Sequence, residues 1–300
     1  MKTKKILIIL AVVFLYCNTY AQNDGAANTG LAFLKIGVGA RAIAMGDAFS
    51  SVVDDATAVI YNPARLTIGN ANNVSLMHNT GMMDMNTNFI GAKTRIGKLG
   101  IGFGLLQTSV DGIEVRNIPG APIDNFDAKN LSLGLSAGLE IYKNITVGLT
   151  VKMLYEKIFI DEAAGTGVDI GTSYSKDNLN FSFVIANLGS VNELRNVATK
   201  LPTLVRFGGS YKYIRNDIGI IFGVESFKVL DGGLLHIHSG AEFGYKDFIF
   251  IRAGYQTNYE NKGLTTGAGV KYKGISLDYA FVPYSLTFGN SSTFSLGFSF

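Results

Sequence analysis

The chain has 300 residues, of which 47% are hydrophobic, with a mean hydropathy of +0.24 and a formal net charge of +3. After the N-terminus no run of about 18 apolar residues occurs, which excludes membrane-spanning helices. The small charge argues against a nucleic-acid partner. A chain this apolar is then either a large soluble β protein or a membrane β-barrel. Its 36 glycines, 20 phenylalanines, 14 tyrosines and only 5 prolines favour long β-strands.

The first 21 residues have the parts of a secretory signal peptide. Lysines precede an apolar stretch over 6–16, and an A-x-A-like cleavage site ends at Ala21. Cys17 is the only cysteine, and a lipid anchor there lacks the small preceding residue that the motif needs. We therefore expect residues 1–21 to be removed on export. The mature chain then has no disulfide or thiol chemistry.

From Asn72 onward, apolar and polar residues alternate with a period of two, the pattern of strands with two different faces. In 131–141, leucine, alanine and isoleucine alternate with serine, glycine and a glutamate, and 145–156, 264–273 and 275–281 repeat the pattern. Such segments are near the 9–11 residues that a tilted membrane strand needs. The polar face is also small, which suits a barrel lumen better than the open face of a soluble sandwich.

Long and short connections alternate between these segments. Tight turns are predicted near 97–98, 142–144, 176–178, 215–217, 246–247 and 273–274, and loops at 78–85, 107–130, 157–166, 187–203, 227–233, 257–263 and 285–292. Long outer loops and short periplasmic turns are typical of outer-membrane barrels. The sequence therefore predicts an all-β fold: a transmembrane outer-membrane antiparallel β-barrel of about 14 strands over 72–300. Strand boundaries stay open in 72–95, where the alternation is poor.

The last predicted strand places Phe294, Leu296, Phe298 and Phe300 on one face and small polar residues on the other. This ending resembles the C-terminal signal that the bacterial barrel-assembly machinery reads. An edge strand of a soluble sandwich would alternate in the same way. Together with the signal peptide and the loop pattern, it predicts a location in the bacterial outer membrane.

Residues 22–71 break the alternation. Asp54 or Asp55 can cap a short helix over 56–61, and Asn62 followed by Pro63 is typical of a second helix start. A barrel of about 14 strands is too wide for its own side chains to fill. We therefore expect a polar tail followed by a small plug, or hatch, that folds into the periplasmic mouth of the barrel.

The plug segment reads GARAIAMGDAF at 39–49 and DDATAVIYNPARL at 54–66. This resembles the opening of PorV/PorQ-type outer-membrane proteins, relatives of the FadL-like fatty-acid transport barrels. The resemblance implies the plug-motif residues Arg41, Asp54, Asp55, Asn62 and Pro63. It also implies a role beside the translocon of type IX secretion. FadL-like relatives instead carry hydrophobic molecules through a plugged lumen to a lateral opening.

No pattern in the sequence indicates catalysis. The histidines are His78, His236 and His238, and no serine or aspartate is set apart as a partner for any of them. His236 and His238 share a strand face and could supply two metal ligands, but a third, such as Asp278, would have to come from elsewhere. Hydrogen-bonded lumen residues explain the pair more simply. We therefore expect no catalytic residue, no metal and no cofactor.

Charges of both signs lie on the predicted lumen face. The residues expected to line the lumen are Lys152, Arg206, His236, His238, Glu242, Arg252, Lys271 and Asp278. Mixed signs argue against a strongly ion-selective pore. They favour salt bridges that brace the lumen and hold the plug through Arg41, Asp54 and Asp55. Reversing the charge of Asp54 and Asp55 should then raise conductance in planar bilayers, and unchanged conductance would argue against that role.

Three functions remain open. The first is an accessory of type IX secretion, with a translocon and its cargo proteins as partners. The alternative is FadL-like transport of hydrophobic small molecules such as fatty acids or aromatics, which predicts an apolar pocket near the plug and a break in strand pairing. Leu154, Val184 and Ile221 are apolar residues on inward registers that could line such a path. A passive pore is the third. All three place the barrel in outer-membrane lipid.

Overall fold

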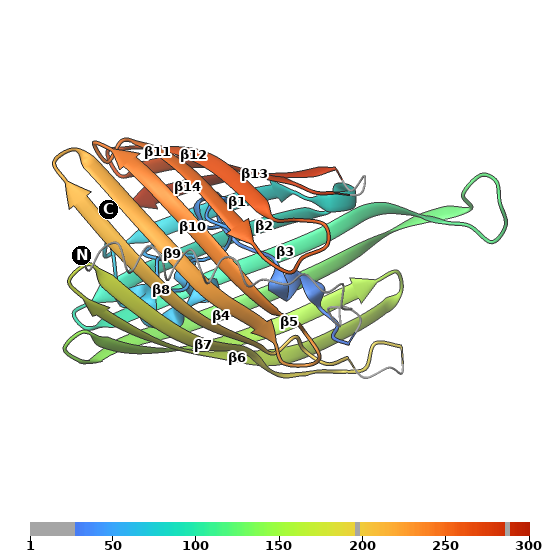
Figure 1. The fold of residues 1–300 in the computed structure, drawn as a ribbon. Coiled ribbons are helices and arrows are strands. Elements are labelled where there is room, and N and C mark those ends of the chain that lie inside the picture. The colour runs from blue at the N-terminus through green and yellow to red at the C-terminus, as the bar shows by residue number, and fades with distance from the viewer. Residues whose placement is uncertain (1–27, 196–198, 286–288) are drawn as a thin grey trace.

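A computed structural model describes residues 28–195, 199–285 and 289–300, and the predicted signal peptide lies outside them. In these residues 14 strands form a closed barrel in which neighbours pair antiparallel and β1 pairs with β14 (Figure 1). Closure leaves no open sheet edge, which a barrel in lipid requires because unpaired backbone groups are costly there. The prediction of an all-β, 14-strand antiparallel barrel is confirmed.

The described elements have the following bounds. The strands are β1 (Asn73–Thr80), β2 (Asn86–Ile96), β3 (Leu99–Val115), β4 (Asp124–Tyr142), β5 (Ile145–Ile158), β6 (Asp161–Lys176), β7 (Leu179–Val191), β8 (Leu204–Arg215), β9 (Ile218–Val229), β10 (Leu235–Tyr245), β11 (Ile249–Gln256), β12 (Leu264–Tyr272), β13 (Ile275–Pro283) and β14 (Asn290–Ser299). The helices are η1 (Ala32–Lys35), α2 (Ala40–Ala44), α3 (Ala58–Tyr61), η2 (Pro63–Thr67) and η3 (Met82–Asp84). No helix in the described part of the chain is long and apolar enough to cross a membrane.

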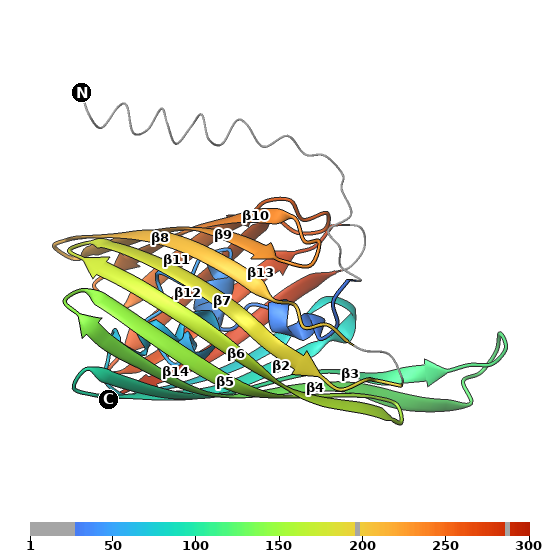
Figure 2. The same ribbon diagram turned by 90° about the horizontal axis from the view of Figure 1, so that it is seen from below.

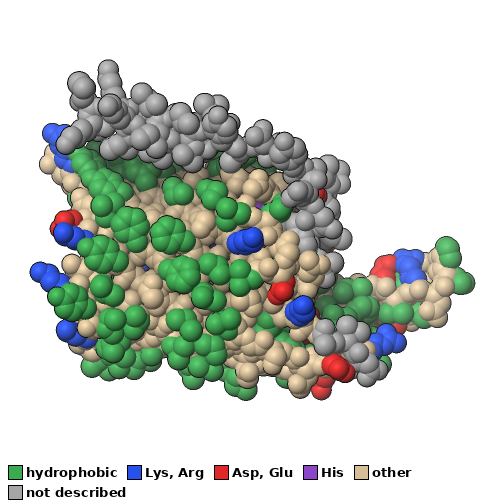
Figure 3. Space-filling view, turned by 60° about the horizontal axis from the view of Figure 1, so that its bottom comes forward, with side chains coloured by type: hydrophobic (Ala, Val, Ile, Leu, Met, Phe, Trp, Pro, Cys, Tyr) green, Lys and Arg blue, Asp and Glu red, His purple; other side chains and the backbone are tan. Residues whose placement is uncertain are grey.

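The two faces of each strand have opposite character. In β5, Val151 and Met153 point outward and are 50% and 65% exposed, whereas Thr150 and Lys152 point inward and are 0% and 5% exposed. Hydrophobic side chains crowd the visible outer wall, and most charged ones in that view lie toward its two ends (Figure 3). An apolar exterior around a polar interior is the arrangement that a lipid-spanning barrel needs.

A ring of tyrosines marks the end of the barrel that carries the tight turns. Tyr142, Tyr174, Tyr213, Tyr245 and Tyr272 are exposed at or near the ends of β4, β6, β8, β10 and β12. Aromatic side chains with one polar atom favour the boundary between lipid and water. Because the chain has no tryptophan, tyrosine takes this place.

The six predicted tight turns are confirmed, each lying between the ends of two consecutive strands. Two predicted loops are wrong. Most of 107–130 belongs to β3 and β4, which form a hairpin that projects beyond the rest of the barrel (Figure 1). The loop expected at 157–166 is a turn of Phe159 and Ile160 between β5 and β6. Pairing uses backbone hydrogen bonds, so it continues through charged or small residues where side-chain alternation fades.

The described residues that precede β1, 28–72, lie in the barrel (Figure 2). η2 packs against β3, β4, β5 and β6, and α2 packs against β11, β12 and β13. At the loop end, the N–H of Gly30 donates to the carbonyl of Lys200 at 3.0 Å. The sequence predicts a plug in the periplasmic mouth; in the structure two further short helices, η1 and α2, carry the segment along the lumen as far as the loop end.

Candidate functional site

Apolar side chains form the body of the plug. Phe49 and Tyr61 are both buried and meet edge to face, with ring centroids 5.3 Å apart at 71°. Leu66 is fully buried in the same cluster as Phe89 and Leu106, which point inward from β2 and β3. Because apolar burial drives this association, the plug is part of the hydrophobic core and is not a loose lid.

Glycines on the lumen face allow the plug backbone to touch the wall. A Cβ atom on Gly240 of β10 would collide with the carbonyl of Met45, and one on Gly148 of β5 would collide with Pro63 and Ala64. The sequence shows these glycines only as small members of a polar face. Their role as seats for the plug follows from the tertiary structure, since only glycine permits so close a backbone approach.

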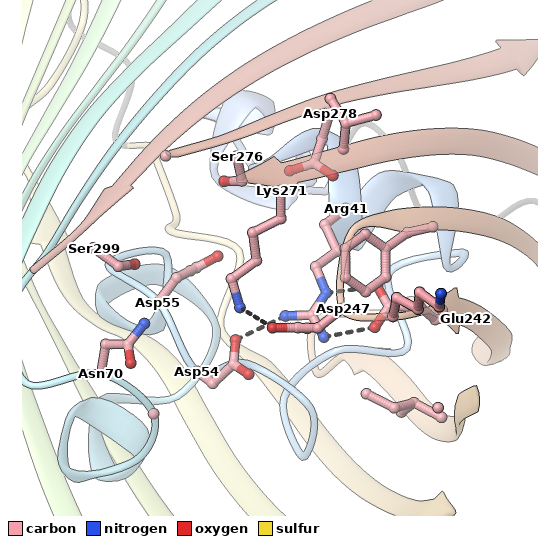
Figure 4. Close-up of a pocket in the computed structure, with 18 of the residues that line it drawn as sticks. Arg41, Asp54, Asp55, Asn70, Glu242, Asp247, Lys271, Ser276, Asp278 and Ser299 are labelled. Atoms are coloured by element: carbon pink, nitrogen blue, oxygen red, sulfur yellow. Dashed lines mark hydrogen bonds and ion pairs between the residues drawn. The ribbon is translucent and has the colours of Figure 1, made fainter. Parts of the chain in front are cut away.

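A buried ionic cluster joins the plug to the wall (Figure 4). The Arg41 guanidinium donates to both carboxylate oxygens of Glu242, from Nε at 2.8 Å and from Nη2 at 2.9 Å. Its Nη1 donates to Asp54 at 2.7 Å. Arg252 donates to Glu242 at 2.6 Å and to Asp278 at 2.7 Å. Four of the predicted residues, Arg41 and the wall residues Glu242, Arg252 and Asp278, therefore meet in one network, with Asp54 at its edge.

Asp54 and Asp55 act differently from each other. The backbone carbonyl of Asp54 accepts a hydrogen bond from Lys93 Nζ at 2.7 Å. Burial raises the pKa of Asp54, but the positive charges of Arg41, Lys93 and Arg65 together outweigh burial, so this pKa lies below its ordinary value. Asp55 was expected to face lumen charges, yet its carboxylate accepts the N–H of Thr57 at 2.8 Å within the plug. Burial, and then the charge of Asp54, raise the pKa of Asp55.

Asn62 and Pro63 shape the turn-side end of the plug. Asn62 Oδ1 accepts the N–H of Ala64 at 3.1 Å, with Pro63 in the first position of η2, as the sequence predicts. Its Nδ2 also donates to the carbonyl of Thr172 on β6 at 3.1 Å. One amide therefore starts a helix and attaches it to the wall.

Two further ion pairs of the lumen are almost fully buried. Arg206 pairs with Glu225 at 2.6 Å, and the other oxygen of Glu225 accepts the plug N–H of Ser50 at 2.8 Å. Lys152 pairs with Asp169 at 2.8 Å. Pairing compensates much of the cost of burying these charges.

The histidine pair faces the lumen and stacks on aromatic rings. His236 lies on Tyr259 with ring centroids 4.0 Å apart at 17°, and His238 lies on Phe227 at 5.3 Å and 15°. His238 Nε2 is 3.1 Å from the hydroxyl of Tyr259. Within the described residues, no group of three or more His, Cys, Asp or Glu side chains could hold a metal ion.

Lys271 lies apart from the buried cluster. Its ammonium group pairs with Asp247 at 3.0 Å, and the two side chains are 37% and 74% exposed. Asp247 belongs to the tight turn between β10 and β11. Lys271 therefore lies at the turn-side rim of the lumen (Figure 4).

Sequence reasoning missed a further link between plug and wall. Tyr61 donates its hydroxyl hydrogen to Asp47 at 2.7 Å and accepts the N–H of Val38 at 2.9 Å. Gln256 Nε2, from the end of β11, donates to the other Asp47 oxygen at 2.9 Å. Asp47 and Tyr61 belong to the motif that carries the family resemblance, but nothing in the sequence brings Gln256 to them.

The plug separates two cavities. The turn-side cavity, of about 780 Å³, is lined by Arg41, Asp54, Glu242 and residues of the tight turns. The loop-side cavity, of about 270 Å³, is lined mainly by uncharged side chains, among them Phe227 and Tyr259. The two sides of the plug thus differ: one is rich in charged side chains, and the other combines apolar and aromatic side chains with mostly uncharged polar ones.

Comparison with known proteins relates the chain by fold. No family model and no curated protein sequence matches it. Among solved structures, the CymD monoaromatic hydrocarbon channel is 13% identical with a TM-score of 0.63, over 91% of this chain and 99% of that one. The toluene transporter TodX of Pseudomonas putida is 14% identical with a TM-score of 0.63, over 87% and 96%. A FadL homologue of Pseudomonas aeruginosa is 13% identical with a TM-score of 0.54, over 86% and 96%.

The fold is therefore that of FadL-type outer-membrane barrels. At this level of identity the likeness concerns the architecture and not the substrate. The resemblance to PorV/PorQ-type proteins, read from the plug motif, stays a prediction.

Proposed function

We propose that this protein is a non-enzymatic channel of the bacterial outer membrane that takes up hydrophobic small molecules. The observation that carries the proposal is the loop-side cavity, which is lined by apolar and aromatic side chains together with polar ones and is bounded on its turn side by the plug. Ligand sites are typically concave and mostly apolar with a few polar groups. A seated plug with buried ion pairs at its turn-side end blocks a direct aqueous route.

An apolar cluster extends from this cavity to the wall. Phe227 and Val229 line the cavity and belong to one buried cluster with Val184, Ala186 and Leu204. Two of the three inward apolar residues expected from the sequence, Leu154 and Val184, are 2% and 1% exposed inside the barrel. Ile221 lies elsewhere, since it lines the ionic turn-side cavity.

The barrel wall has a pairing defect beside this cluster. The register between β6 and β7 shifts between Val168 and Ile170. There Asn187, at a φ of 62°, donates its N–H to the Asp169 side chain at 2.7 Å. The pairing of β7 with β8 ends at Ala186 and Leu204. A bulge interrupts the backbone ladder locally, and β7 and β8 separate beside it, so we propose lateral release into the membrane here.

A disulfide staple tests this route. Ala186→Cys with Leu204→Cys joins directly paired residues beside the defect, and Leu179→Cys with Tyr211→Cys joins the same two strands at their other end as a matched control. Cells with the oxidised first staple should take up radiolabelled toluene more slowly, and reductant should restore the rate. Equal rates for both staples would refute the lateral route. Uptake that does not depend on the protein would refute the proposed function.

The secretion role implied by the plug motif is the alternative. The projecting β3–β4 hairpin is the feature that favours it, because it exposes Ile118 and Ile123 at 76% and 65%. Exposed apolar groups of this kind are common at protein interfaces. Affinity purification from detergent-solubilised outer membrane separates the two proposals. Recovery of a large translocon barrel with the chain would favour secretion, and a lone barrel would favour transport.

A further inference from the structure

The loop-side cavity is the size of one small aromatic molecule. Its volume is about 270 Å³. An apolar cavity of about 150 Å³ holds benzene, whereas drug-sized ligands occupy roughly 300–1,000 Å³. The cavity therefore fits a single substituted ring better than a long chain.

Aromatic rings line one side of this cavity. His236 and Tyr259 stack at 4.0 Å, and Phe227 lies 6.0 Å from His236 at 55°. Tyr284 also lines the cavity. Rings of this kind favour a flat aromatic ligand, because offset and edge-on aromatic contacts stabilise beyond simple burial.

Two lysines supply positive charge to the same cavity, and one of them, Lys262, lies with its ammonium group 4.3 Å from the centroid of the Tyr259 ring. The other, Lys35, lies in the last turn of η1, lines the cavity and is half-buried. No carboxylate or carbonyl of the described residues pairs with its ammonium group. Asp47 is the only acidic side chain among the described residues of this lining, and both its oxygens are engaged, by Tyr61 and Gln256. The charge of Lys35 is thus available to an anion.

Two buried polar atoms of the lining have no partner in the described part of the chain. They are Gln256 Oε1 and Thr29 Oγ1, on side chains that are 3% and 8% exposed. Gln256 has committed its Nε2 to Asp47 and to the carbonyl of Gly46. Its oxygen can only accept, so it calls for a donor such as a hydroxyl group.

We propose that the loop-side cavity binds a single-ring aromatic carboxylate that carries a hydroxyl group, that is, a phenolic acid. Lys35 binds the carboxylate, Phe227, His236 and Tyr259 hold the ring, and Gln256 accepts from the hydroxyl. This inference rests on the proposed uptake function and names its substrate class. A neutral hydrocarbon would leave the Lys35 charge and the Gln256 oxygen without partners, which costs affinity.

Calorimetry on the full chain in detergent tests the assignment with 4-hydroxybenzoate, benzoate and toluene as probes. We expect binding to weaken in that order. Lys35→Met should lower the affinity for 4-hydroxybenzoate about tenfold or more, which is the size expected for losing a hydrogen bond to a charged group. Lys98→Met, in the exposed turn between β2 and β3, is the matched control and should not change binding. Thermal melting of both variants checks that the barrel is folded.

The outcomes separate this inference from the proposed function. Toluene binding as tight as that of 4-hydroxybenzoate, or equal affinities in the native chain and a folded Lys35→Met variant, would overturn the phenolic-acid assignment. Protein-dependent toluene uptake would still support the channel in that case. Failure of every probe to show protein-dependent uptake would overturn the channel itself.

Discussion

Removal of Arg41 should release the plug from the wall. Its side chain is 19% exposed, and its partner Glu242 is 5% exposed. The Arg41→Ala variant loses two hydrogen bonds to Glu242 and one to Asp54, at 2.7–2.9 Å. It also loses the contact of the guanidinium with the Phe49 ring, at 5.5 Å.

The loss in free energy of plug seating depends on the partners that Glu242 keeps. Breaking a buried ion pair by removing one partner costs about 3–5 kcal/mol. Glu242 keeps Arg252 at 2.6 Å, so the lower end applies. About 3 kcal/mol corresponds to roughly a hundredfold rise in the ratio of displaced to seated plug.

Cysteine labelling measures this ratio. Ala48 of the plug is 1% exposed, and Cys17, in the predicted signal peptide, is the only native cysteine. A Cys17→Ser, Ala48→Cys chain should therefore react with maleimide only when the plug moves. Adding Arg41→Ala should raise the labelling rate about a hundredfold, in line with the population change. Open-state conductance in planar bilayers should rise with it.

A surface pair provides the control. Arg116 and Glu114 pair on the projecting hairpin with side chains 42% and 50% exposed, so Arg116→Ala should leave labelling unchanged. Equal labelling rates in Arg41→Ala and Arg116→Ala chains would refute the reasoning, because the ionic cluster would then contribute nothing to plug seating.

Three other sets of substitutions test the contacts that hold the plug in the barrel. Gly240→Val should lower the thermal midpoint because its side chain meets the plug backbone, whereas Gly219→Val, with open space around it, should not. The ionised form of Asp54 favours the folded plug, since its pKa lies below the ordinary value. This stability is present at neutral pH and is lost as pH falls through the lowered pKa. In the Asp54→Asn variant the thermal midpoint should therefore depend less on pH between about pH 5 and pH 2. Phe49→Ala should cost about 3–5 kcal/mol and make the plug protease-sensitive, and full resistance would contradict its place in the core.

Much of the wall could be predicted because strands carry a local signature. The period of two in 131–141 and 145–156 assigns each residue to a face, and that assignment holds for Thr150, Val151 and Lys152 alike. The same rule fails at 107–130 and 157–166. Strand ends continue there by backbone pairing, which side-chain alternation does not report.

The sequence predicted individual residues of the candidate site but not which of them meet. Arg41, Glu242, Arg252 and Asp278 were each recognisable as inward or plug charges, but their meeting depends on how β10, β11, β13 and the plug are placed. Asp55 binds Thr57, two residues further along the chain, and this local contact competes with any distant partner. Gln256 and Lys35 carried no local pattern at all.

The sequence by itself determined the class of fold: alternation, turn spacing and a polar–small inner face are properties of neighbouring residues, and a barrel is built from them strand by strand. Only the tertiary structure decided how far the plug reaches, which glycines seat it, and that it divides the lumen into an ionic and an aromatic cavity. The physical reason is that these features are contacts between residues up to 255 positions apart, such as Ala40 and Ser295. No local pattern encodes such contacts, and they exist only once the barrel has closed around its own N-terminal segment.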